Sequence, residues 1–93
     1  MVKIIWTESA VEDLRLIHEY ISKDSKRYAD RFVEILIERV DQLESFPNSG
    51  RVVPEFNLES IRELIEGNYR VVYKKTANQV AIIRVHHSAR KLK

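Results

Sequence analysis

Two helical repeats of apolar residues precede a series of short strand-like runs, and this order is the strongest constraint on the fold. The first repeat runs at steps of three and four through Ala10, Leu14, Ile17 and Ile21, and it predicts an amphipathic helix that ends near Ser22. The second repeat predicts another amphipathic helix, and its members are Ala29, Phe32, Leu36, Val40 and Leu43.

The strand-like runs lie on both sides of the predicted helices. They cover residues 2–6 before the first helix, and residues 60–66, 69–75 and 79–87 after the second. Gly67-Asn68 is a compact hairpin signal, and residues 51–58 are expected to form an irregular connection. The order β-α-α-β-β-β predicts an α+β fold, in which a helical hairpin packs on a small antiparallel sheet.

Polar residues mark where each predicted helix begins. Thr7 or Ser9 is expected to cap the first helix, and Ser9 with Glu12 has the spacing of a capping box. Asp24 or Ser25 is expected to cap the second helix.

The composition predicts one domain over residues 1–93. Apolar residues make up 44% of the chain and cysteine is absent, which excludes disulfides and thiolate metal sites. We expect no metal and no cofactor. Because no apolar run approaches the ~20 residues of a membrane span and the N-terminus lacks signal-peptide features, we expect a cytoplasmic protein without membrane contact.

The charge is distributed unevenly along the chain. Residues 1–50 hold seven Lys/Arg against ten Asp/Glu, whereas residues 51–93 hold nine against four. From Tyr69 to the end there are seven basic residues and no acidic ones. Such a field attracts polyanions or an acidic protein partner, and the alternative interpretation is a solvated basic tail.

The second helical stripe is wider than one core contact requires. Val33, Ile35 and Ile37 extend it. One interpretation is that the domain itself covers this helix on two sides, and the other is that part of the helix binds a partner.

Three groups of residues, in order and covering nearly the whole chain, resemble the RelE/ParE toxin superfamily. The first is Trp6-Thr7-Glu8-Ser9-Ala10 with Asp13-Leu14, Ile17 and Tyr20-Ile21; the second is Leu43-Glu44-Ser45-Phe46-Pro47 with Gly50-Arg51 and Val53-Pro54-Glu55; the third is Ile61-Arg62-Glu63-Leu64, Tyr69-Arg70-Val71-Val72-Tyr73 and Val85-His86-His87-Ser88-Ala89-Arg90.

The resemblance implies a toxin that arrests growth when its labile antitoxin is degraded, and a toxin–antitoxin hetero-oligomer. RelE-like members cut messenger RNA in the ribosomal A site. ParE-like members poison DNA gyrase and have no established hydrolytic site. A non-toxic basic binding module on the same fold is a third hypothesis.

Aligned with RelE-like toxins, this chain has several candidate catalytic residues. Arg70 and Arg90 match catalytic arginines, His87 matches a catalytic histidine, and Glu55 is a candidate base. Metal-free RNA cleavage needs a base, an acid and cations for the phosphorane, and the planar guanidinium suits the last role. These residues favour RNA cleavage slightly over gyrase inhibition.

Other features favour the ParE-like branch. RelE-type lysines are replaced by Ile61 and Glu63, a tyrosine near the C-terminus is missing, and residues 82–87 look closer to ParE-type sequences. Strand alternation sends Arg84 and His87 to opposite faces unless a bulge intervenes. The alternative role for Arg70 is an ion pair with Glu63 or Glu66.

For two other groups of residues we favour a structural role. His86 is expected to be a partly buried polar residue at the strand end rather than a catalyst. Trp6, Tyr69 and Tyr73 are expected to pack within the protein rather than stack on bases.

Overall fold

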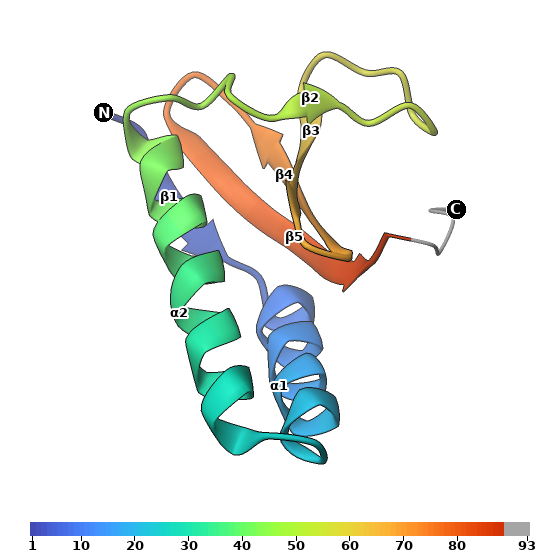
Figure 1. Ribbon diagram of the computed structural model, residues 1–93. Coiled ribbons are helices and arrows are strands. Elements are labelled where there is room, and N and C mark those ends of the chain that lie inside the picture. Colours follow the sequence, from blue (N-terminus) through green and yellow to red (C-terminus); the bar gives the residue numbers. More distant parts are fainter. Residues whose placement is uncertain (89–93) are drawn as a thin grey trace.

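The computed structural model describes residues 1–88 and places two helices on one face of a five-stranded sheet (Figure 1). The elements are β1 (Lys3–Trp6), α1 (Glu8–Ser22), α2 (Lys26–Asp41), the 3-10 turn η1 (Gln42–Glu44), β2 (Arg51–Val52), β3 (Ile61–Glu66), β4 (Tyr69–Lys75) and β5 (Gln79–His87). The predicted order is confirmed, and β2 is an addition, because residues 51–58 were expected to be irregular throughout.

The sheet is mostly antiparallel, in the order β1-β5-β4-β3-β2. Strands β2 to β5 pair antiparallel through consecutive connections, whereas β1 pairs with β5 in parallel. The parallel pair places the first strand of the chain beside the last described strand, with the helical hairpin and the other strands between them in sequence. Gly67 adopts φ 58° in the β3–β4 turn, as the hairpin signal predicted.

Thr7, rather than Ser9, caps α1. The Thr7 hydroxyl accepts a hydrogen bond from the Ala10 backbone N–H at 3.2 Å and donates one to the Ile82 carbonyl at 2.8 Å. The predicted Ser9–Glu12 capping box is therefore wrong, because the competing hydroxyl also binds β5. Ser25 caps α2 as expected.

Both helical stripes form the core against one face of the sheet. Ala10, Leu36, Val40 and Leu43 are fully buried and cluster with sheet residues; the sheet residues are Leu64, Val71, Tyr73, Val80, Ile82 and Val85. Trp6 packs at the edge of this cluster. Val33 and Ile35 are half-buried and Ile37 is exposed, so the domain covers most of the wide stripe by itself.

A bulge at Ile83 changes which alternate residues of β5 face the helices. Tyr73 lies opposite Ile82, and the next residue, Val72, lies opposite Arg84. Ile82 and Val85 consequently both face the helices, although they are three residues apart. The bulge precedes Arg84, so the alternation from Arg84 to His87 stays regular, as predicted.

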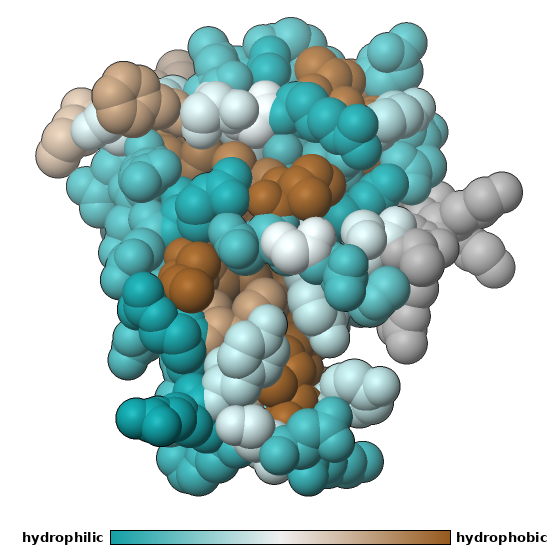
Figure 2. Space-filling model, in the orientation of Figure 1, coloured by the Kyte–Doolittle hydropathy of each residue, from teal (hydrophilic) through white to brown (hydrophobic). Residues whose placement is uncertain are grey.

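The opposite face of the sheet has a small buried layer of its own. Val53 and Val72 are buried there outside the main cluster, together with Glu63. Elsewhere the surface visible in Figure 2 is largely hydrophilic, with apolar residues in separate patches. No helix within residues 1–88 is long and apolar enough to cross a membrane.

Candidate functional site

Four side chains of alternating charge meet on the sheet face opposite the helices. Arg51 Nε lies 2.6 Å from Glu63 Oε2, and Arg70 Nε lies 3.3 Å from Glu63 Oε1. Arg70 also binds Glu55, with Nη1–Oε2 at 2.8 Å and Nη2–Oε1 at 3.3 Å. We call this set, Arg51–Glu63–Arg70–Glu55, the charge network.

Strand register brings the network together. Arg51 lies opposite Glu63 across β2 and β3, and residues opposite each other project from the same face. Glu63 and Arg70 alternate with Leu64 and Val71, whose side chains face the helices. The Glu63 side chain is 0% exposed and Arg70 as a residue is 8% exposed, so both charges depend on each other for compensation.

His86 lies directly across from Arg70 on the same face. Its Nδ1 lies 3.1 Å from the His87 carbonyl oxygen, and its buried Nε2 has no hydrogen-bond partner. Burial and the neighbouring Arg70 charge lower the pKa of His86 below its ordinary value of 6.5. This confirms the expectation of a buried polar residue at the strand end.

His87 lies on the helix-covered face instead. It pairs across the strands with Tyr69, and the two rings meet edge to face with centroids 5.4 Å apart. Tyr69 also contacts Phe32 of α2, with centroids 5.1 Å apart. The sheet therefore separates His87 from Arg70.

The structure thus brings together only part of the predicted catalytic set. Glu55 and Arg70 are in contact, but as an ion pair, and His87 is on the other face. Arg90 lies outside the described residues. The alternative role of Arg70 as an ion-pair partner of Glu63 is confirmed, whereas Glu66 pairs with Arg39 of α2 at 2.8 Å.

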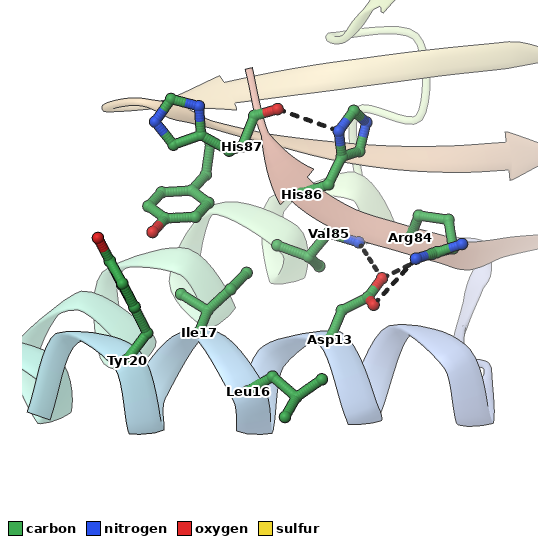
Figure 3. Close-up of a pocket in the computed structure, with 9 residues that line it drawn as sticks. Asp13, Leu16, Ile17, Tyr20, Arg84, Val85, His86 and His87 are labelled. Carbon is green, nitrogen blue, oxygen red and sulfur yellow. Dashed lines mark hydrogen bonds and ion pairs between the residues drawn. The ribbon is translucent and has the colours of Figure 1, made fainter. Parts of the chain in front are cut away.

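A groove between α1 and the end of β5 is a second candidate site (Figure 3). At its base the Asp13 carboxylate accepts hydrogen bonds from Arg84 Nε at 2.7 Å and from the Val85 N–H at 3.0 Å. We call this the α1–β5 groove; it has a volume of about 410 Å³ and is lined by Asp13, Leu16, Ile17, Tyr20, Tyr69, Arg84, Val85, His86 and His87.

No motif in the sequence predicts this groove. The available signal was the apolar Leu16 and Tyr20 outside the stripe that forms the core. No cluster within residues 1–88 has three or more His, Asp or Glu arranged to hold a metal ion.

Two helices packed on one face of a five-stranded, mostly antiparallel sheet also form the fold of RelE/ParE superfamily toxins. A family model described as the ParE toxin of type II toxin–antitoxin system, parDE, matches residues 4–92. Toxin RelE2 of Caulobacter vibrioides is 32% identical over 91 residues, which cover 97% of this chain and 99% of that protein. The chain therefore belongs to the ParE toxin family within this superfamily.

Solved structures agree on the fold. The chromosomal ParDE system from P. aeruginosa matches with a TM-score of 0.77 and 23% identity, covering 94% of this chain and 96% of that one. The toxin–antitoxin complex RelBE2 from Mycobacterium tuberculosis matches with a TM-score of 0.61 and 22% identity, covering 92% and 96%. The two structures thus share the fold of this chain, which the family model assigns to the toxins of type II toxin–antitoxin systems.

Proposed function

We propose that this toxin arrests growth in the cytoplasm by binding and inhibiting DNA gyrase, without cutting RNA. ParE-like toxins poison gyrase, and the match to the ParE family model over residues 4–92 supports that branch. The observation that carries the proposal is that Arg70 and His87 project from opposite faces of the sheet, so the candidate cation and the candidate proton-transfer group do not share one site.

RNA cleavage would require Arg70 to act as a free cation beside an acid and a base. A guanidinium that already binds a carboxylate through two nitrogens has to give up that contact before it can bind a phosphorane. His87, the candidate proton-transfer group, lies across the sheet from Arg70. Binding to a protein target requires neither a free Arg70 nor a proton-transfer group beside it.

Purified toxin tested in a gyrase supercoiling assay and on programmed ribosomes separates the two mechanisms. We expect supercoiling to be inhibited while the messenger in the A site stays intact. Arg70→Lys keeps the network charge and is expected to leave inhibition unchanged. Toxin saturated with antitoxin is the control, and it should neither inhibit supercoiling nor cut the messenger.

Ribosome-dependent RNA cleavage is the second candidate, because the chain is 32% identical to a protein named Toxin RelE2 over nearly its full length. A cut messenger that disappears with Arg70→Lys and with His87→Gln would establish this candidate and exclude the gyrase proposal. Cleavage of that kind requires Arg70 to leave Glu55 on the ribosome.

A further inference from the structure

The segment that follows β2, residues 53–59, returns to the sheet through a small number of contacts. Val53 at its start is fully buried, whereas Phe56 and Leu58 are 36% and 52% exposed. Glu55 extends from this segment to Arg70, and Glu59 binds Arg62 and Lys75 at 2.9 and 3.1 Å. Apolar burial therefore holds the beginning of the segment, and ion pairs hold the rest together with backbone hydrogen bonds from Phe56 and Asn57 to the Val53 carbonyl at 3.2 and 2.9 Å.

Glu55 occupies Arg70 in the manner of a bound anion. Its two oxygens face two terminal nitrogens of the guanidinium, at 2.8 and 3.3 Å. The same planar fork binds carboxylates and phosphates through paired N–H donors. The Glu55 side chain is 23% exposed, so a solvent-borne anion can compete with it, whereas the fully buried Glu63 is not open to such exchange.

The charges of the network balance only while Glu55 is present. Arg51 and Arg70 are offset by Glu63 and Glu55, and the Arg51 side chain is 59% exposed. When Glu55 leaves, two guanidinium groups share one buried carboxylate, and the surplus positive charge lies at Arg70. The adjacent His86 supplies no anion to replace it.

We propose that Glu55 is an internal latch on an anion site centred on Arg70, and that its displacement opens this site to the phosphodiester backbone of a nucleic acid. The carboxylate takes the place of a phosphate while the toxin is free. Binding of a nucleic acid at Arg70 does not require gyrase to be the target of the toxin.

The test compares Glu55→Gln with Glu59→Gln, which removes the same charge from the same segment without touching Arg70. Binding of fluorescein-labelled single-stranded DNA and RNA of one sequence is measured by fluorescence anisotropy at fixed salt. We expect Glu55→Gln to bind both about tenfold more tightly than wild type, which corresponds to one charge-assisted hydrogen bond. Glu59→Gln should gain far less.

The double variant Glu55→Gln/Arg70→Gln is expected to lose the gain. An equal gain in Glu59→Gln, a gain that survives in the double variant, or no gain in a Glu55→Gln protein with a native circular dichroism spectrum would overturn the latch. Wild-type toxin gives an independent readout, because saturating DNA should speed amide hydrogen exchange in residues 55–58. Unchanged exchange there would also contradict the proposal.

Discussion

At the scale of single residues, the fold lowers the pKa of the His86 imidazole. Burial is the main cause of its lowered pKa, and the charge of the facing Arg70 adds to the effect; Arg84 adds further, while Asp13 and the His87 carbonyl oppose it. The unfolded chain therefore binds a proton more readily than the folded chain. The stability that this difference provides is fully present above pH 6.5 and is lost as pH falls towards the lowered folded pKa.

We predict that the free energy of unfolding decreases as pH falls from about 7 to about 5, and that His86→Gln flattens this decrease. The carboxylates with lowered pKa values, such as Glu59, lose their contribution only at lower pH, so the two effects separate. Urea unfolding at a series of pH values measures the slope. A slope unchanged by His86→Gln would disprove the assignment.

Residue contacts could be predicted where strand register determines them. The pairing of Glu66 with Tyr69 across the hairpin placed Arg62 and Arg70 on opposite faces, as observed. The same register places Glu63 on the face of Arg70, where the two side chains form the ion pair. The Arg70–Glu55 contact could not be predicted. Glu55 lies in the loop between β2 and β3, and this loop has no periodic pattern that would indicate where its side chains lie.

At the scale of elements, Asp13 joins α1 to β5. Strand β1 pairs with β5 only as far as Ile82, so the later part of β5 is a sheet edge on that side. The Asp13 carboxylate accepts the Val85 N–H at this edge and also binds Arg84. An edge N–H left without a partner is costly, and a helix side chain satisfies it here.

We predict that Asp13→Ala lowers the free energy of unfolding by about 2 kcal/mol, since it leaves the Val85 N–H and the Arg84 side chain without this acceptor. Chemical denaturation measures the loss. Glu12→Ala is the matched control on the preceding residue, because Glu12 also binds an arginine but its side chain is 54% exposed, and no measurable change is expected. Equal losses in the two variants would show that Asp13 does not join the elements.

Gly50 determines how closely the connection after η1 approaches the sheet. Its N–H donates to the Tyr73 hydroxyl at 3.0 Å, and a Cβ there would lie 2.6 Å from the Glu63 carbonyl oxygen. We predict that Gly50→Ala costs about 1–3 kcal/mol through overpacking. Gly67→Asn is the control, because its turn has open space and asparagine tolerates positive φ. A Gly50→Ala protein as stable as wild type would contradict this close approach.

The types of the elements and their order could be predicted from the sequence, whereas contacts between elements far apart in the sequence could not. The stripes in α1 and α2 and the bounds of β4 and β5 follow directly from periodicity. The parallel β1–β5 pair and the hydrogen bond from the Thr7 hydroxyl to the Ile82 carbonyl both depend on β5 meeting the N-terminal segment. Residues more than 70 positions apart make these contacts, and local patterns carry no information about them.

At the scale of the whole molecule, the α1–β5 groove lies beside the part of the chain that has no acidic residues. One binding partner can therefore contact both the groove and the basic strands. The segment from Tyr69 onwards has no acidic residue, and β4 and β5 belong to it. Beside β5 the groove exposes Leu16 by 49% and Tyr20 by 67%, with Arg84 at its border (Figure 3). Exposed apolar side chains next to strands that carry basic and no acidic residues favour an amphipathic, acidic segment of the antitoxin.

We predict that the antitoxin docks in this groove and that charge accelerates the encounter. Leu16→Glu and Tyr20→Glu should each weaken antitoxin binding by at least about tenfold, because both place a charge in an apolar contact. Tyr28→Glu is the matched control, since Tyr28 is equally exposed, at 65%, but lies on α2 outside the groove. The association rate, measured by stopped flow, should fall as ionic strength rises, because salt screens the attraction between exposed charges. A rate independent of salt would refute the electrostatic part. An equal loss of affinity in Tyr28→Glu would move the docking surface away from the groove.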